Sequence, residues 1–292
     1  MVRGVVPVVF RWRAPAWQAD VDAFGELRTS TLLRLLQETA TRASTDAGFD
    51  PAYYRDSGAM WLVRRTAVAL LAPVRYGDEI EIRTWIADFR RVRSQREYEL
   101  SVGERPVARA HTDWVYVDAA GRPARIPADM ERRFVPEGGA TLDRPPFPAP
   151  PPAAPAITTT RRIELHELDA IRHVNNANYV HYLEQVALDA CAAVRWPLAA
   201  QLEAGGRFRA TAHDIEYLEP ALYDDAVIVR SWLVGLDATE VERHTEIGRA
   251  AGPRPLVRAR SRFAWVGRDD GRPLAIPDGL HAALATSTVP AA

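Results

Sequence analysis

The two halves of this 292-residue chain repeat each other. Sliding the sequence by 147 residues places identical residues on one another: Asp22 on Asp169, Ala40 on Ala187, Pro73 on Pro220, Tyr76 on Tyr223, Asp78 on Asp225, Arg83 on Arg230 and Trp85 on Trp232. Further along, Gly121–Pro127 echoes Gly271–Pro277 at a slightly longer offset, a difference that a hairpin turn absorbs. So many matches indicate an internal duplication, and the chain is expected to fold as two copies of one unit.

A segment rich in Pro, Ala and Gly separates the halves. Residues Glu137–Ile157 read EGGATLDRPPFPAPPPAAPAI, a composition typical of a semi-rigid, extended linker. We therefore expect an N-terminal domain over 1–136, a linker over 137–157 and a C-terminal domain over 158–292.

Each half has the same predicted order of elements: a short strand, a loop, a long helix and four further strands. Apolar residues at helical spacing predict the helices at about 29–47 and 177–194. The short first strands are expected at 8–13 and 161–166. The later strands are expected at 61–71, 79–87, 94–102 and 107–117, and again at 208–218, 226–234, 240–247 and 256–266. A long helix covered by a curved, mainly antiparallel sheet is an α+β layout, here repeated in tandem.

The charged residues exclude several classes of function. All 37 basic residues are arginines, against 38 acidic residues, and the formal net charge is −1. Without lysine there is no P-loop, pyridoxal Schiff base or kinase-type ATP site, and the balanced charge argues against nucleic acid as the main partner. The single cysteine, Cys191, excludes an internal disulfide, and its place on the apolar helix face favours a buried side chain. No apolar run has the length of a membrane helix or the layout of a signal peptide, so we expect a cytoplasmic protein.

The loop before the second helix carries most of the chain's chemistry; residues 167–184 read ELDAIRHVNNANYVHYLE. Asp169 precedes a helix N-terminus, where its carboxylate can activate water or attack a carbonyl. Free N–H groups of the first turn, that of Asn176 among them, can stabilise an oxyanion, and Asn175 or Asn176 can cap the helix. His173 can orient the carboxylate or share in proton transfer. No histidine has metal-ligand spacing, so we expect neither metal nor cofactor.

The pattern D-x-x-x-H-V-N-N-x-x-Y-x-x-Y-x-E, from Asp169 to Glu184, resembles the active-site motif of hotdog thioesterases, notably the acyl-ACP and 4-hydroxybenzoyl-CoA thioesterase groups. The repeated Pro-x-x-Tyr-x-Asp and Gly-Arg-Pro-x-x-Ile-Pro segments also resemble that group, so the resemblance covers both halves. It implies two tandem hotdog domains packed as a pseudo-dimer. It further implies hydrolysis of a thioester of acyl carrier protein or coenzyme A, with Asp169 as base or nucleophile and His173 as its partner.

Several positions depart from the family's pattern. Ile171 stands where the plant enzymes have an asparagine, which favours a simpler mechanism centred on the aspartate. Glu219 lies near the place of a catalytic acid in those enzymes, although Ala221 fits that place better without gaps. In the first half Asp22 is kept, but Glu26 replaces the histidine and Arg28-Thr29 replaces the asparagine pair. We expect that half to shape the acyl pocket, with Asp22 and Glu219 as further candidates.

Two more features are candidates for function. Glu184 follows on the predicted helix and either contributes to the site or satisfies a buried polar group. Arg90, Arg91 and Arg93 form a basic turn that is either a solvated hairpin face or a binding site for coenzyme A phosphates or an acidic carrier protein.

Two other functions stay open at this point. A hotdog hydratase or dehydratase would bind the same thioesters, but the chain has no His-Phe-Pro-Gly motif. A non-catalytic acyl-thioester-binding protein is the other alternative, and no basic helix-turn-helix segment supports it. The sequence leaves the acyl group, further self-association, and a role in fatty-acid or polyketide metabolism undetermined.

Overall fold

The computed structural model describes residues 9–134, 145–147, 156–252 and 254–287. The chain divides into two compact units, unit 1 (Met1–Arg144) and unit 2 (Pro145–Ala292), and each is described by itself. Most of the predicted linker, 137–157, lies outside the described residues, as does Val8 of the first predicted strand. Within the described part of the chain, no helix is long and apolar enough to cross a membrane.

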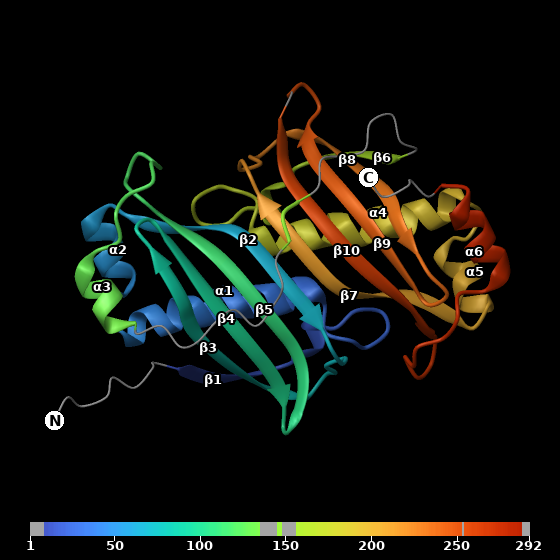
Figure 1. The fold of residues 1–292 in the computed structure, drawn as a ribbon, viewed down its shortest axis with the longest axis horizontal. Coiled ribbons are helices and arrows are strands. Elements are labelled where there is room, and N and C mark those ends of the chain that lie inside the picture. The colour runs from blue at the N-terminus through green and yellow to red at the C-terminus, as the bar shows by residue number, and fades with distance from the viewer. Residues whose placement is uncertain (1–8, 135–144, 148–155, 253, 288–292) are drawn as a thin grey trace. The chain divides into compact units, whose positions relative to one another are not determined.

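Unit 1 is an antiparallel sheet with one long helix against it (Figure 1). Its strands are β1 (Phe10–Pro15), β2 (Met60–Leu70), β3 (Glu79–Arg90), β4 (Arg93–Val102) and β5 (Arg105–Val117). Their order across the sheet is β1-β3-β4-β5-β2. The helix α1 (Thr29–Asp46) packs on β1 and β3. The remaining elements are the 3-10 turn η1 (Gln18–Asp20) and the short helices α2 (Pro51–Ser57) and α3 (Ala128–Arg133).

Unit 2 repeats this plan. Its strands are β6 (Ile157–Arg162), β7 (Gly206–Tyr217), β8 (Ala226–Leu236), β9 (Glu240–Arg249) and β10 (Pro255–Gly267), in the order β7-β10-β9-β8-β6. The helix α4 (Tyr179–Ala193) packs on β6 and β8. Two 3-10 turns, η2 (Leu165–Glu167) and η3 (Asn176–Asn178), precede it, and α5 (Leu198–Glu203) and α6 (Asp278–Ala285) complete the unit. The tandem α+β architecture predicted from the duplication is confirmed.

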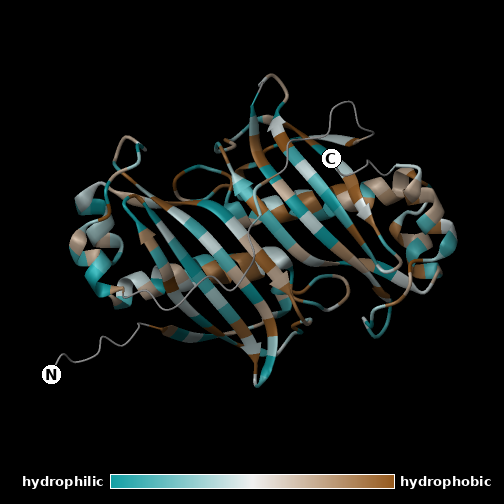
Figure 2. Ribbon diagram, viewed as in Figure 1, coloured by the Kyte–Doolittle hydropathy of each residue, from teal (hydrophilic) through white to brown (hydrophobic). Residues whose placement is uncertain are grey.

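Alternating polarity along the strands builds the core (Figure 2). In β3 every second side chain is buried from Ile80 to Ile86. The face of α1 predicted to be apolar is also buried, through Leu32, Leu33, Leu36, Ala40 and Ala43. Each large aliphatic side chain removed from water contributes about 1.5–3 kcal/mol. The sheet and its helix therefore stabilise each other through one continuous apolar layer.

The first strand of unit 2 lies earlier than the sequence predicts. It spans Ile157–Arg162 rather than 161–166, because three threonines, Thr158–Thr160, pair antiparallel with β8. The residues that follow form η2, in which the Glu167 side chain accepts the N–H of Glu164 at 2.8 Å. This local capping bond ends the strand.

A buried charged cluster links β4 and β5 in unit 1. The ring nitrogens of His111 contact carboxylate oxygens of Glu97 at 2.6 Å and of Asp113 at 2.7 Å. His111 and Glu97 are both fully buried. Burial alone would lower the pKa of His111, but the hydrogen bonds to the two carboxylates outweigh it, so the pKa lies above its usual value. Below this raised pKa the ring is an imidazolium, and each of its two N–H groups donates to one of the acids.

This cluster makes the stability of the chain depend on pH. Because the folded-state pKa of His111 is raised, its contribution is fully present below about pH 6.5 and is lost as pH rises through the raised value. Urea unfolding across pH 6 to 9 should therefore show a falling free energy that His111→Asn largely removes. Parallel curves for the two proteins would contradict the assignment.

The glycine that opens β7 is a packing constraint. A Cβ added to Gly206 would lie 2.5 Å from the indole of Trp265, which is buried in the core of unit 2. We expect Gly206→Ala to lower the free energy of unfolding by about 3 kcal/mol, measured by denaturant titration. Gly248→Ala is the matched control in β9, because its added Cβ would meet nothing closer than 3.6 Å. Equal losses in the two variants would refute the packing explanation.

Candidate active site

The segment between β6 and α4 folds into a tight loop. Asp169 Oδ1 accepts hydrogen bonds from the backbone N–H groups of Ile171 at 3.0 Å and His173 at 3.2 Å. The Asp169 N–H donates to the His173 carbonyl at 2.8 Å and closes the loop, with Arg172 in the left-handed region at φ 64°. One carboxylate oxygen is thus fixed by the backbone. The other, Oδ2, has no hydrogen-bond partner among the residues that the structure describes.

The chain then enters α4 through η3. Asn175 caps this turn, because its Oδ1 accepts the Ala177 N–H at 3.0 Å. Its carbonyl accepts the Asn178 N–H at 2.8 Å. The N–H of Asn176 has no acceptor in the described ranges, so it is the first-turn donor left for a ligand oxygen. Of the two asparagines that the sequence suggested as possible caps, Asn175 makes the side-chain capping bond.

The loop rests on a buried carboxylate that the sequence did not single out. Glu167 is 5% exposed, and its Oε1 accepts from Arg161 at 2.6 Å and from the Tyr182 hydroxyl at 2.7 Å. Its backbone carbonyl accepts from the Asn178 side chain at 2.7 Å and from the Asn175 N–H at 2.9 Å. Glu167 thus joins β6, the loop and the first turns of α4.

Three tyrosines hold the helix start against its neighbours. The Tyr179 hydroxyl accepts the Ala221 N–H at 3.3 Å, and the Tyr217 hydroxyl donates to the Asn176 carbonyl at 3.2 Å. Burial raises the pKa of Tyr179 to about 12, and burial together with the bond to Glu167 raises that of Tyr182. The Tyr179 and Tyr182 rings therefore stay neutral near pH 7, and the three tyrosines act through hydrogen bonds and packing.

Unit 1 contains a loop of the same conformation, but with other side chains at the positions of the histidine and the capping asparagine. Asp22 Oδ1 accepts from Phe24 and Glu26 at 2.8 and 3.0 Å, as Asp169 does in unit 2. However, the N-cap of α1 is Arg28, which makes no side-chain cap bond. Glu26, in place of the histidine, is buried. Unit 1 therefore keeps the loop's conformation and loses the cap and the imidazole.

The support of the loop also differs between the units. Asp20 stands where unit 2 has Glu167, and its carboxylate accepts only the Trp17 N–H, at 3.3 Å, among the described residues. The positions of Arg161, Asn178 and Tyr182 are Ala14, Thr31 and Leu35 in unit 1. The buried charge and its partners therefore belong to the unit that carries His173 and the asparagine cap.

The remaining candidates lie apart from this loop or are tied to other groups. Glu184 on α4 lies 3.6 Å from Nε2 of buried His213, whose Nδ1 contacts Ser261 Oγ at 2.9 Å. Glu219 pairs with Arg249 at 3.3 Å. Cys191 is buried, and burial raises the pKa of its thiol to about 11, so it remains protonated.

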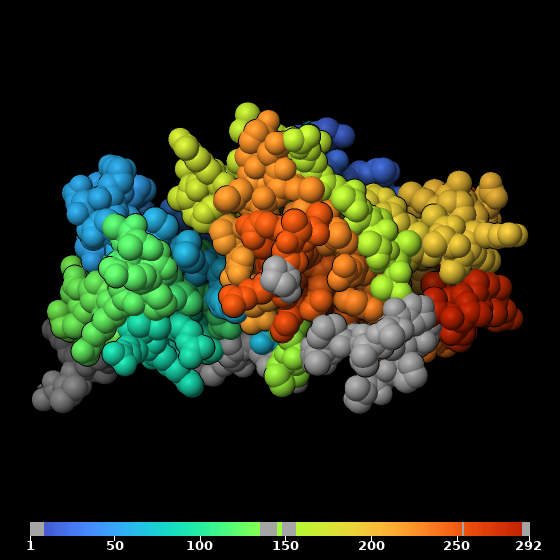
Figure 3. All heavy atoms as spheres, turned by 90° about the horizontal axis from the view of Figure 1, so that it is seen from above, coloured from blue at the N-terminus to red at the C-terminus, as the bar shows by residue number. Residues whose placement is uncertain are grey.

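Two exposed regions contain residues considered above. The start of unit 2, drawn in yellow-green, reaches the face shown in Figure 3, and Leu165 and Ile171 around the loop are exposed. Arg90, Arg91 and Arg93 lie at the exposed turn between β3 and β4 of unit 1. Among the described residues, no three His, Cys, Asp or Glu side chains are grouped to hold a metal ion.

The two units match thioesterase families separately. Residues 8–134 match the family described as "Acyl-ACP thioesterase N-terminal domain", and residues 163–284 match the "Thioesterase-like superfamily". The chloroplastic acyl-(acyl-carrier-protein) hydrolase FATB2 of Cuphea viscosissima is 24% identical over 193 residues, which cover 60% of this chain. The match spans 46% of that relative, about half its length.

Solved structures share the fold over nearly the whole chain. The 12:0-ACP thioesterase from Umbellularia californica is 18% identical with a TM-score of 0.71, covering 91% of this chain and 94% of its own. An acyl-ACP thioesterase from Bacteroides thetaiotaomicron is 16% identical with a TM-score of 0.69, covering 87% and 97%. These likenesses establish the tandem hotdog fold. The family matches therefore assign the fold of unit 1 to the N-terminal domain of acyl-ACP thioesterases and unit 2 to the thioesterase-like superfamily.

Proposed function

We propose that this protein hydrolyses acyl thioesters of acyl carrier protein to a free acid and a thiol, with Asp169 at the centre of the reaction. The observation that carries the proposal is a loop that holds one carboxylate oxygen of Asp169 and is followed, seven residues on at a helix start, by the N–H of Asn176, which has no acceptor among the described residues. A thioester needs both, a group that delivers oxygen to the carbonyl carbon and a donor for the developing oxyanion.

The steps follow from this arrangement. Asp169 Oδ2 takes a proton from water as the water oxygen bonds to the thioester carbonyl carbon. The Asn176 N–H and the positive end of α4 stabilise the tetrahedral oxyanion, which then collapses with cleavage of the C–S bond. The thiolate leaves and receives the proton that Asp169 took from water, directly or through the half-buried His173 of the same loop, which restores the carboxylate. Direct attack by Asp169 through an acyl anhydride is the alternative use of the same carboxylate.

Glu167 acts as a positioning residue for this chemistry. Its side chain anchors the loop to β6 and α4, and its carbonyl fixes Asn175 and Asn178 on either side of the Asn176 N–H. A buried charge with full partners resists displacement because each lost bond leaves a desolvated group. The oxyanion donor and the Asp169 loop therefore keep their places without a ligand.

The family match of unit 1 favours acyl carrier protein as the carrier. Coenzyme A presents the same pantetheine arm and the same thioester, so acyl-CoA is the second substrate to test. The absence of lysine leaves arginine as the residue that would contact phosphate or carboxylate on either carrier.

Replacing Asp169 by Asn tests the proposal. The amide keeps an oxygen to accept the Ile171 and His173 N–H groups but cannot take a proton, so the loop should persist while chemistry stops. We expect kcat for thiol release to fall by about a thousandfold, with Tm changed by only a few degrees. A panel of acyl-ACP and acyl-CoA substrates, read with a thiol reagent, provides the measurement.

Asp22→Asn is the matched control, because Asp22 makes the same loop in unit 1. It should leave kcat within about threefold, because unit 1 lacks the imidazole and the cap. Unchanged turnover in Asp169→Asn would remove that residue from the mechanism. Enoyl-thioester absorbance without thiol release would point to a dehydratase instead.

A second pair of variants tests the positioning role. Glu167→Ala removes the partner of Arg161 and Tyr182 as well as the capping acceptor, whereas Asp20→Ala in unit 1 removes only a capping acceptor. We expect kcat to fall about a hundredfold in Glu167→Ala and less than about threefold in Asp20→Ala, with KM changed little in either.

Stability separates this role from a general loss of folding. Asp20→Ala should cost about 1 kcal/mol for its cap, and Glu167→Ala about 3 kcal/mol because Arg161 loses its buried partner. Kinetics are measured where circular dichroism shows both variants folded. Equal kcat values in the two variants would show that Glu167 serves only the fold.

A further inference from the structure

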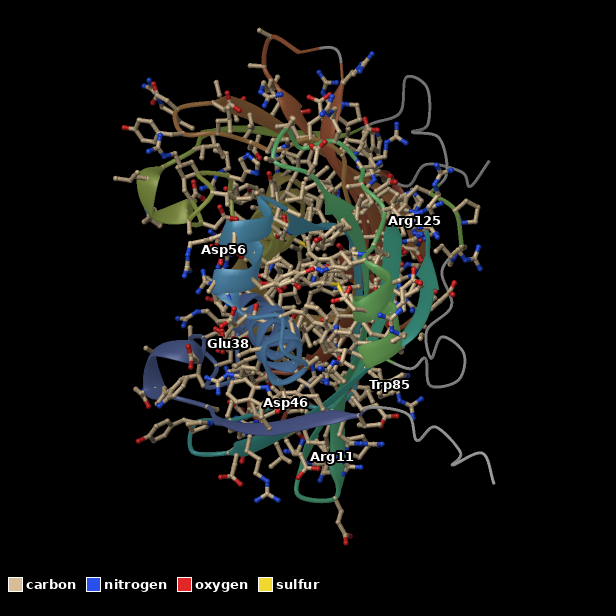
Figure 4. The ribbon with its side chains drawn as sticks, turned by 90° about the vertical axis from the view of Figure 1, so that its left-hand side faces the viewer. Arg11, Glu38, Asp46, Asp56, Trp85 and Arg125 are labelled. Carbon is tan, nitrogen blue, oxygen red and sulfur yellow. The ribbon has the colours of Figure 1, made fainter. Side chains whose placement is uncertain are left out.

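One end of unit 1 carries an exposed arginine surface. We define it by Arg91 and Arg93 in the β3–β4 turn, Arg125 in the following loop, and Arg132 and Arg133 at the end of α3, all exposed. The Ile126 N–H donates to the Arg91 carbonyl at 2.9 Å, which joins the turn to the loop. Figure 4 faces this end of the unit and labels Arg125.

These five guanidinium groups have no acidic partner among the described residues, unlike their neighbours. Arg90 bonds to Asp88 at 2.6 Å, and Arg122 bonds to Asp118 at 3.1 Å. Two acidic residues, Asp129 and Glu131, lie on α3 beside Arg132 and Arg133. The surface therefore keeps a positive excess, which disfavours the folded state through like-charge repulsion.

The duplication supplies an internal comparison. The corresponding end of unit 2 has the same backbone contact, in which the Ile276 N–H donates to the Ala238 carbonyl at 2.8 Å. There the equivalents of Arg91, Arg93, Arg125, Arg132 and Arg133 are Ala238, Glu240, Ala275, Ala282 and Ala283. That end also carries Asp237, Asp269, Asp270 and Asp278. The fold thus forms without a single one of these arginines.

We propose that the arginine surface is the docking site for the acyl carrier protein, recognised as an acidic protein; this rests on the proposed function. Five exposed charges spread over three elements suit a protein surface with several carboxylates better than one phosphate group, which needs converging donors. Exposed charge pairs act mainly on encounter and affinity, so this surface should govern KM and leave the chemical step alone.

The test neutralises three of these arginines in the full chain, as Arg93→Gln, Arg125→Gln and Arg133→Gln together. We expect KM for acyl-ACP to rise about tenfold at low salt, with kcat within twofold and the difference shrinking as salt is added. Hydrolysis of the matching N-acetylcysteamine thioester, which has no carrier protein, should not change. Direct binding of acyl-ACP by calorimetry should weaken by the same factor.

The control is Arg268→Gln with Arg272→Gln at the equivalent end of unit 2, which should leave acyl-ACP binding unchanged. Unaltered acyl-ACP affinity in the triple variant would overturn the proposal. So would an equal rise in KM for acyl-CoA, which would identify a phosphate site. If no thioester releases thiol, the proposed function fails, and calorimetry alone still decides the docking surface.

Discussion

The site depends on burying one negative charge, that of Glu167, where strand, loop and helix meet. Removing a carboxylate from water costs several kcal/mol, and the cost is offset only when charge partners and hydrogen bonds are all in place. Arg161 and Tyr182 supply them from β6 and α4. Because these partners come from different elements, their contacts with Glu167 tie the strand, the loop and the helix start together. The Glu167 carbonyl extends these contacts to the residues that follow the Asp169 loop, because it accepts hydrogen bonds from Asn175 and Asn178.

Comparison of the two units separates what the fold requires from what the chemistry requires. Both units keep an aspartate that accepts two backbone N–H groups, so this loop is part of the hotdog scaffold as the chain builds it. Within the described residues, only unit 2 adds the imidazole of His173, the cap made by Asn175 and the buried Glu167 with its partners. Under the proposed function only unit 2 needs a catalytic loop, so unit 1 can carry residues that serve another purpose. We interpret the arginines at the end of unit 1 in this way, because the loop of that unit lacks the imidazole and the asparagine cap.

The sequence predicted the architecture because the signals were long and repeated. A helix such as α1 shows its period over eighteen residues, and a strand such as β3 alternates buried and more exposed side chains from Glu79 to Thr84. The same order of predicted elements in both halves, at an offset of 147 residues, then supported the assignment of each element. The strand β6 was misplaced because six residues carry little periodicity, and its threonines are polar by composition but favourable in a strand that pairs with β8. The four short helices were also missed, since each has eight residues or fewer.

Within the site, sequence reasoning found the residues that form a motif and missed those that work through contacts. Asp169 and Asn175 stand in a contiguous pattern, and the cap made by Asn175 follows from its place before a helix. Glu167 stands two residues before the motif's aspartate. From sequence alone, an acidic residue at such a position in a loop is expected to be solvated. Only three-dimensional placement brings Arg161 and Tyr182 to it across the strand and the helix. One sequence signal existed all the same: at +147, Ala14 and Leu35 align with Arg161 and Tyr182. Polar residues that appear together in one copy of a duplication, at positions apolar in the other, indicate a shared partner. That comparison is available for any tandem repeat before a structure is known.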